Sequence, residues 1–335
     1  MSWSVIYKDD QDEVYLDSIV KSIKWSGDIK QASRKLTVEL ANTDDRRERL
    51  IHLEKGGELR LINNDKELFR GVLFADSIQA SGQMSVTAYD ENIYLTKNKD
   101  TRIFRNQTAS AIVKKLCGDF SVAAGTIDDT GYVIPKLVFR DKTLFEMMVT
   151  ALTVSQNQNG KRFYLTSSEG KLHLLARKDQ KVQWVLENGV NILDASYSQS
   201  IEETKTQVKV IGSDSKKKEL SATAKDGELA RRFGVMQLLE KPEQTMTSSQ
   251  MQQLANQLLK DHGTIDDEAR IECLGIDEVI SGAAVYVKES MTQILGGYYI
   301  SADEHSFENG RHTMSLTLSA TDDLPKMEYK EPKEG

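Results

Sequence analysis

The stretch GQMSVTAYD (residues 82–90) and a second stretch, RHTMSLTLSATD (residues 311–322), contain nearly the same strand sequence, far apart in one chain. Both read Met-Ser-aliphatic-Thr, and both close their segment with an aspartate. Alternation of apolar and polar residues is typical of a strand with one buried and one exposed face. The recurrence of nearly the same strand sequence suggests that a larger unit is repeated in the chain.

The residues that precede the two stretches follow the same order at similar intervals. In each region a glycine precedes a short alternating run, a second glycine follows 14 or 15 residues after the first, and the methionine follows 13 or 17 residues later. The extra residues fall in a polar turn, where an insertion costs little. The matched positions are Gly57, Gly71 and Met84 in the first region and Gly282, Gly297 and Met314 in the second.

The pattern along the chain predicts a mainly β fold with two similar small antiparallel barrels and an inserted α+β domain of helices and a hairpin. In the middle region, Thr108 is a candidate helix N-cap, Thr143 and Glu146 form a capping-box pattern, and Gly160 ends the second helix. In a further predicted amphipathic helix, Gly263 is the C-cap and five apolar residues share one face: Met251, Leu254, Ala255, Leu258 and Leu259. The predicted boundaries are 1–97 for the first barrel, 98–186 for the α+β domain, 187–212 with 265–323 for the second barrel, 213–264 for a small insertion with a hairpin and a helix, and 324–335 for a flexible tail.

The composition excludes several classes of protein. A formal charge of −7 argues against a protein that coats DNA, because such a protein needs a basic surface. We expect no membrane-spanning segment, because no run of about 18 apolar residues occurs, and we see no secretory signal. Cys117 and Cys273 lie in a helical and an alternating pattern, so we expect two buried thiols and synthesis in a reducing cytoplasm.

The sequence offers no convincing catalytic, cofactor or metal site, and we expect none. No histidine has a second His or Cys at zinc-ligand spacing, and no nucleotide or hydrolase motif occurs. The segment DEHSFE (303–308) resembles a metal or acid–base cluster, but we interpret it as a solvated hairpin loop. The run SDSKKK (213–218) is interpreted as a charged hairpin tip. The histidines are His52, His173, His262, His305 and His312.

Three segments resemble the tail hub proteins of PBSX-type defective prophages, the XkdQ/YqbQ group. They are SIKWSGDIKQASRKLTVEL (22–40), the middle run from FRNQTASAIVKKLCGDF to KTLFEMMVTAL, and the run from TQVKVIGSDSKKKEL to QQLANQLLKDHG. The resemblance covers nearly the whole chain. The wider class includes the baseplate hubs of contractile-tailed phages and the N-terminal part of the VgrG spike of type VI secretion.

The resemblance implies a structural hub without enzymatic activity, built as a homotrimer in which each chain contributes two tube-like barrels. Three chains then offer six similar surfaces to the six-fold tail tube and three to the spike, while DNA or tape-measure protein passes through the ring. The implied partners are the tube protein, a separate spike protein and other baseplate proteins, with the tape-measure protein as a further candidate. The implied location is a virion tail or phage-like particle, assembled in the bacterial cytoplasm.

Two questions stay open at this stage. The polar residues Lys35, Thr37 and Glu39 alternate with an apolar strand face, and they either line the pore or face solvent. An alternative function is a tail-associated protein that binds or degrades the cell wall through the 98–186 domain. A free glycosidase is disfavoured because 7% aromatic residues give little sign of a sugar-binding cleft.

Overall fold

The computed structural model describes residues 3–10, 12–178, 181–213, 219–242, 245–329 and 331. Strands make up 49% and helices 17% of the chain, so the prediction of a mainly β fold is confirmed. The chain divides into two compact units, unit 1 (Met1–Ala195 and Arg270–Gly335) and unit 2 (Ser196–Ala269). None of the helices in the described ranges is long and apolar enough to cross a bilayer.

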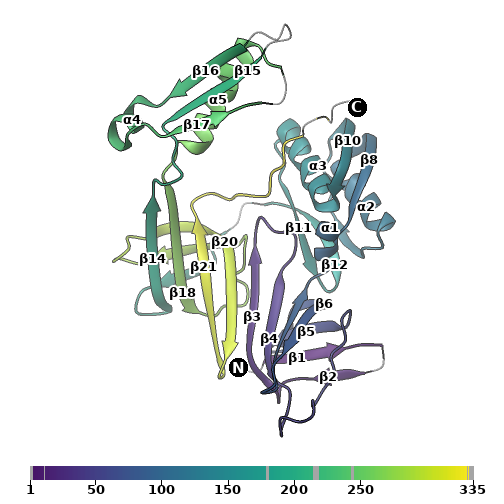
Figure 1. The fold of residues 1–335 in the computed structure, drawn as a ribbon. Helices are drawn as coiled ribbons and strands as arrows, with labels where there is room; N and C mark the ends of the chain where they lie inside the picture. The colour runs from purple at the N-terminus through teal and green to yellow at the C-terminus, as the bar shows by residue number, and fades with distance from the viewer. Residues whose placement is uncertain are drawn as a thin grey trace. The chain divides into compact units, whose positions relative to one another are not determined.

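A 13-stranded sheet contains two sets of strands (Figure 1). The strand β14 (Ile192–Ser200) leads from unit 1 into unit 2, and β18 (Asp266–Leu274) leads back. The first strand set comprises β1 (Trp3–Lys8), β2 (Glu13–Tyr15), β3 (Val20–Asp28), β4 (Lys35–Ala41), β5 (Glu58–Asn63), β6 (Lys66–Ile78) and β7 (Gln83–Tyr89). The second strand set comprises β13 (Trp184–Glu187), β14 (Ile192–Ser200), β18 (Asp266–Leu274), β19 (Ala284–Lys288), β20 (Leu295–Glu308) and β21 (Arg311–Ser319).

The two strand sets have the same strand order. The first set runs β1-β5-β6-β7-β4-β3, and the second runs β13-β19-β20-β21-β18-β14. The two sets join where β20 pairs with β3 in antiparallel fashion, which Figure 1 shows as neighbouring yellow and purple strands. The outer strands differ in direction, because β1 runs antiparallel to β5 whereas β13 runs parallel to β19.

The register of the strands supports the repeat in detail. The long strands β6 and β20 each carry an irregularity at the same point, after Leu73 and after Ile300. Counted from this bulge, Met84 and Met314 occupy equivalent positions opposite Ile78 and His305, as the shared Met-Ser-aliphatic-Thr pattern predicted.

The predicted glycine equivalences are wrong by one residue. The amide of Gly56 donates to the Leu73 carbonyl at 2.9 Å, and the amide of Gly282 donates to the equivalent Ile300 carbonyl at 2.7 Å. Gly56 (φ 94°) and Gly282 (φ 91°) both adopt a conformation that only glycine reaches easily. Gly282 therefore matches Gly56 and not Gly57, because the backbone conformation, rather than the count between glycines, fixes the equivalence.

The predicted closed barrels are not observed, because none of the sheets in the described part of the chain closes on itself. Both strand sets belong instead to one open sheet. The first part of β6 pairs with β5, and its second part pairs only with β7. The apolar core of the first set includes Phe307 of β20, so the core continues across the junction between the sets.

A module of helices and strands lies between the two sets in sequence. The N-cap of Thr108, the capping box of Thr143 with Glu146, and the left-handed Gly160 at the helix end are confirmed. Its core includes Ile112 and Leu116. The elements are α1 (Ile93–Lys97), β8 (Lys99–Thr108), α2 (Ala109–Asp119), β9 (Ala124–Ile127), β10 (Val133–Thr143), α3 (Leu144–Asn159), β11 (Phe163–Ser168) and β12 (Lys171–Ala176).

Unit 2 consists of a three-stranded sheet, in the order β16-β15-β17, and two helices. The predicted helix is present, begins after the N-cap Thr247, and buries Met251 and Ala255 against the sheet. The sequence assigned residues 207–212 to the second barrel, whereas the structure places them in the sheet of unit 2. Of the run 213–218, which was interpreted as a charged hairpin tip, residues 214–218 lie outside the described ranges. The elements are β15 (Gln207–Ser213), β16 (Glu219–Lys225), α4 (Gly227–Phe233), β17 (Gln237–Glu240) and α5 (Ser248–His262).

Candidate functional site: the junction of the strand sets

The segment 303–308, expected as a solvated hairpin loop, forms the end of β20, so this interpretation was wrong. The strand pairs with β3 on one side and β21 on the other, and the turn follows at Asn309 and Gly310. Asp303, His305 and Phe307 are consequently buried on one face. Acidic residues and histidine favour turns locally, but pairing with a strand nearly 300 residues earlier overrides that preference.

The pair Arg34–Asp303 lies near one end of the β20–β3 pairing. Arg34 Nη1 is 2.9 Å from Asp303 Oδ1, and Nη2 is 2.5 Å from Oδ2, so the guanidinium binds the carboxylate with two parallel hydrogen bonds. The Ser281 amide donates a further hydrogen bond of 2.6 Å to Oδ1. The guanidinium also lies 4.3 Å from the ring centre of Trp25. The buried carboxylate is therefore paired and hydrogen-bonded, as a buried charge requires.

Two histidines that are seven residues apart in sequence meet next to this pair. His305 Nδ1 lies 2.9 Å from His312 Nε2, and His305 Nε2 lies 3.1 Å from the carbonyl oxygen of Val279. A carbonyl can only accept, so Nε2 of His305 carries the proton and Nδ1 accepts from His312. Phe307 stacks on His312 at 4.1 Å. This pair could not be recognised from the sequence, because the histidines lie on opposite strands of the β20–β21 hairpin.

Both histidines are neutral at neutral pH. Burial, the largest cause, lowers the pKa of His305 to about 4, although the nearby Asp303 acts in the opposite direction. Burial also lowers the pKa of His312, opposed by Asp277. A protonated imidazole in this position would be a poorly solvated cation beside Arg34.

Polar contacts at the edge of the junction also connect residues distant in sequence. Asn63 Nδ2 lies 3.0 Å from each carboxylate oxygen of Asp277. Lys66 and Glu278 form an ion pair at 2.7 Å, and Lys24 of β3 pairs with Glu304 of β20 at 3.0 Å. The junction thus combines one buried ion pair with several exposed ones. These interactions hold the two strand sets together.

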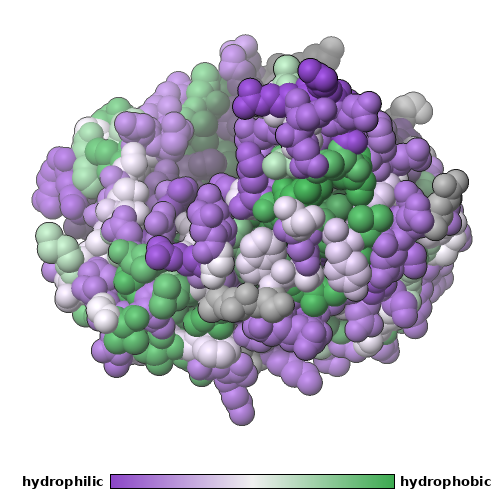
Figure 2. Space-filling view, turned by 90° about the horizontal axis from the view of Figure 1, so that it is seen from below, coloured by the Kyte–Doolittle hydropathy of each residue, from purple (hydrophilic) through white to green (hydrophobic). Residues whose placement is uncertain are grey.

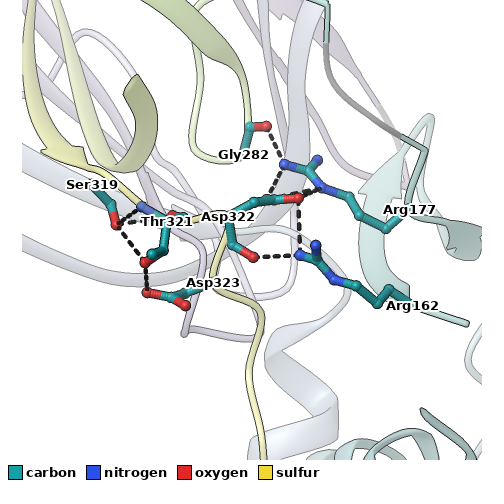
Figure 3. A network of polar contacts seen from close by, with 7 residues as sticks. All are labelled: Arg162, Arg177, Gly282, Ser319, Thr321, Asp322 and Asp323. Atoms are coloured by element: carbon teal, nitrogen blue, oxygen red, sulfur yellow. Dashed lines mark hydrogen bonds and ion pairs between the residues drawn. The ribbon is translucent and has the colours of Figure 1, made fainter. Parts of the chain in front are cut away.

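A second polar network fixes the segment after β21 (Figure 3). The side chain of Arg177 is 5% exposed and donates to Asp322 Oδ1 at 2.6 Å and to the Gly282 carbonyl at 2.6 Å. Arg162 pairs with Asp322 Oδ2 at 2.9 Å. On the other side of Asp322, Thr321 donates to Asp323 at 2.7 Å. This network connects the α+β module, the loop before β19 and the C-terminal segment.

The C-terminal segment, for which a flexible tail was expected over 324–335, makes further contacts as far as it is described. Leu324 is buried, and the amide of Met327 donates to Thr153 of α3 at 3.1 Å. The hydroxyl of Tyr329 accepts a hydrogen bond of 3.0 Å from the Val138 amide, and its ring packs edge-on against Phe139. These contacts dock the segment on the α+β module.

The remaining residues considered from sequence are dispersed. His52 and His262 are exposed, and His173 accepts from the Thr126 amide at 3.0 Å. Cys117 and Cys273 are buried as predicted, and burial raises their pKa values to about 11 and about 12, so both are unreactive thiols. Within the described ranges, no three His, Cys, Asp or Glu side chains are grouped so that they could hold a metal ion.

Comparisons with known proteins agree on one family. The chain is 33% identical to the uncharacterized protein YqbQ of Bacillus subtilis over 313 residues (93% of this chain, 95% of the relative). It is 32% identical to the phage-like element PBSX protein XkdQ of the same organism over 318 residues (94% and 97%). The family model described as YQBQ-like matches residues 23–319.

Solved structures share the fold at low sequence identity. The 43 kDa tail protein of prophage MuSo2 from Shewanella oneidensis superposes with a TM-score of 0.71 at 15% identity, covering 96% of this chain and all of that one. The Escherichia coli protein c3393, described as a type VI secretion component similar to phage T4 tail proteins, superposes with a TM-score of 0.57 at 10% identity (98% and 79%). The resemblance to prophage tail and VgrG-like folds is therefore confirmed, and the chain belongs to the YQBQ-like family.

Proposed function

We propose that the protein is a non-enzymatic structural hub of a phage or phage-like tail baseplate, in which three copies form a ring. The observation that carries this proposal is the repetition of one strand order within a single chain, joined at β20 and β3. Each strand set acts as one barrel-like lobe, so three chains present six similar lobes to a six-fold tube and three identical subunits to a spike. Contacts between two different surfaces of identical subunits form a closed ring when the rotation from one subunit to the next is a whole fraction of a full turn.

A continuous polar sheet face supports passage of DNA or a tape-measure protein through the ring. The side chains opposite the buried core on β21, β20, β3, β4 and β7 are mostly hydroxyls, interspersed with charges of both signs. Of the two alternatives for Lys35, Thr37 and Glu39, we propose that these residues line the channel. Two cross-strand rows on this face are Ser315–Glu304–Ser26–Lys35 and Thr313–Ser306–Lys24–Thr37–Thr87.

Such a face suits a sliding polymer for a physical reason. A basic lining would bind phosphates, and a large apolar lining would bind unfolded protein. Hydroxyls and balanced charges, such as Lys24 paired with Glu304, are already satisfied by each other or by water. The hollow lined by Ser26, Lys35 and Glu304 lies on this face.

The names of the relatives support the proposed partners and location. XkdQ is named as a protein of a phage-like element, and the structural neighbours are tail proteins. We therefore propose a tail tube protein, a separate spike protein and other baseplate proteins as partners, with the tape-measure protein as a transient one. The proposed location is the tail of a virion or phage-like particle assembled in the bacterial cytoplasm.

Light scattering coupled to size-exclusion chromatography, with and without the tube protein, tests the proposal. We expect a mass of three chains and co-elution with tube rings. A protein that stays monomeric at high concentration and in the presence of tube protein contradicts the hub. A peptidoglycan pull-down and a turbidity assay on purified cell walls test the alternative role, and lysis of the walls would contradict a non-enzymatic hub.

A further inference from the structure

A row of hydrogen-bonding groups beside the junction of the strand sets contains three gaps that protons can fill. The carbonyl oxygen of Val279, in the loop before β19, lies 3.1 Å from His305 Nε2, and His305 Nδ1 lies 2.9 Å from His312 Nε2. At the other end of the row, His312 Nδ1 lies 3.6 Å from Asp277 Oδ1. Both atoms at each gap can accept a hydrogen bond, so each gap needs one proton to become a hydrogen bond.

Two neutral histidines cannot fill three gaps, because a neutral imidazole carries one proton. With both protons on the Nε2 atoms, the first two gaps are filled and His312 Nδ1 faces the Asp277 carboxylate with a bare lone pair. With both protons on the Nδ1 atoms, the Asp277 gap is filled and the Val279 carbonyl faces a bare nitrogen instead. The distance at Asp277 is longer than the other two, which places the empty gap at that end.

The packing of the His312 ring keeps its two nitrogens in these positions. The ring stacks on Phe307 with the centroids 4.1 Å apart, and on the other strand connection a Cβ at Gly275 would clash with the ring. The Gly275 amide also donates to the His312 carbonyl at 2.9 Å. The ring therefore cannot turn to exchange its nitrogens without displacing a neighbour, and Nδ1 stays next to Asp277.

The charges around the two rings favour one additional positive charge at His312. The charged groups that face the rings are Asp303 of β20, Arg34 of the β3–β4 turn and Asp277 of the loop before β19. Arg34 and Asp303 neutralise each other in their own ion pair. The Asp277 carboxylate accepts two hydrogen bonds from the neutral amide of Asn63, which does not balance its charge. A protonated His312 would balance it.

We propose that the junction takes up one proton from the solvent at Nδ1 of His312 and holds it as an ion pair with Asp277 while the strand sets stay joined. The proton binds to the nitrogen lone pair, and no bond between heavy atoms changes. The side chain of Asp277 is 16% exposed, so the proton can arrive along the carboxylate, although His312 itself is only 3% exposed. All these residues belong to one chain, so the inference goes beyond the proposed ring and does not depend on it.

A second additional proton has no gap to fill. It would place N–H groups on both sides of the 2.9 Å contact between His305 and His312, where one nitrogen has to accept. Burial opposes this state as well, because it lowers the pKa of both histidines, that of His305 to about 4. The junction therefore accepts one proton in mild acid and loses the contact between the rings with the second.

Nuclear magnetic resonance of the full chain with isotope-labelled histidine tests this count of protons. Long-range proton–nitrogen correlation spectra show which ring nitrogens are protonated, and His305→Gln and His312→Gln identify the two signals. At about pH 8 we expect one proton on each ring. At about pH 5, which lies between the ordinary histidine pKa and that of His305, we expect two protons on His312 and one on His305.

Asp277→Asn removes the charge that holds the proton and keeps the shape of the side chain. Its amide can also donate a hydrogen bond into the empty gap, so the extra proton is no longer needed there. We expect the pH at which half of His312 is charged to fall by about one unit or more. Glu278→Gln is the matched control, because it removes the neighbouring carboxylate and its exposed ion pair with Lys66, and it should leave this pH unchanged.

The inference is overturned if His312 of the parent protein stays neutral at about pH 5, or if His305 is charged before it. A folded form with two protons on both rings would contradict the count of gaps. An equal shift in Glu278→Gln and Asp277→Asn would also overturn the inference, since the effect would then come from the overall charge of the loop. The titration of the parent protein decides the question even where the Asp277 variant does not fold.

Discussion

Arg34, in the turn between β3 and β4, binds Asp303 of β20 through two hydrogen bonds of 2.9 and 2.5 Å, although 269 positions separate them in sequence. The carboxylate is fully buried, and the Arg34 side chain is 17% exposed. This contact thus adds a buried ion pair to the strand pairing that joins the second strand set to the first.

Asp303→Ala should destabilise the protein strongly, because it leaves the Arg34 charge buried without a partner. Loss of one member of a buried pair costs about 3–5 kcal/mol. The measurement is urea unfolding followed by intrinsic fluorescence. Lys24→Ala is the matched control, since the Lys24–Glu304 pair also crosses the junction but is exposed, and it should cost about 1 kcal/mol or less. Equal losses in the two variants would contradict a central role for Asp303.

The histidine pair predicts a loss of stability in acid. In the unfolded chain His305 titrates near pH 6.5, whereas in the folded chain its pKa is about 4. Between these values the unfolded chain binds a proton that the folded chain does not, so stability is present at neutral pH and falls as the pH decreases. The full loss is on the order of 3 kcal/mol.

His305→Gln removes this dependence while keeping a donor for the Val279 carbonyl. The variant should be less stable than the parent at about pH 7.5, and the difference should shrink by up to about 3 kcal/mol at about pH 4.5. The comparison uses urea unfolding at both pH values, with the exposed His52→Gln as control. A constant difference across this range would show that His305 does not titrate as stated.

Alanine should destabilise the protein at both of the equivalent glycines. Gly56→Ala and Gly282→Ala each force a side chain into a left-handed conformation, at about 1–2 kcal/mol. Gly282→Ala should cost more, because a Cβ there meets Ile29 at 3.3 Å and Arg177 at 3.4 Å, while Gly56 has open space. Thermal unfolding measures both. Gly297→Ala, in open space without a positive φ, should be close to neutral; a loss there equal to the other two would refute the conformational explanation.

The Asp322 network predicts how the C-terminal segment is held. Asp322→Ala removes the partner of the buried Arg177, and the segment from 323 onward should become sensitive to limited proteolysis. We expect cleavage before Met327 at a rate at least about tenfold above the parent, corresponding to a loss of about 1.4 kcal/mol or more. The exposed Asp323→Ala, which loses only the Thr321 contact, is the control and should cleave at the parental rate.

Local signals in the sequence predicted α2, α3 and α5, whereas the short helices α1 and α4 were not predicted. The caps of α2, α3 and α5 depend on residues three positions apart, such as Thr143 and Glu146, and these interactions form wherever the chain lies. The repeat was also visible, because Met84 and Met314 are embedded in the same alternation. The buried thiols followed from the periodicity around Cys117 and Cys273.

The junction could not be predicted, because its residues come from distant parts of the chain. From local sequence alone, Asp303 and His305 are typical of a polar turn. They lie in a strand because β20 pairs with β3. Arg34 carries no local sign of its partner. Likewise, whether a set of strands closes into a barrel depends on the pairing of its edge strands, which alternation alone does not encode.

The position of unit 2 in the repeat has a consequence for symmetry. In the first strand set a short loop connects β3 and β4, whereas in the second set the whole of unit 2 stands between the equivalent strands β14 and β18. In a six-lobed ring of three chains, every second lobe would thus carry a copy of unit 2. A partner that contacts only the strand sets would then meet six similar surfaces. A partner that contacts unit 2 would meet three.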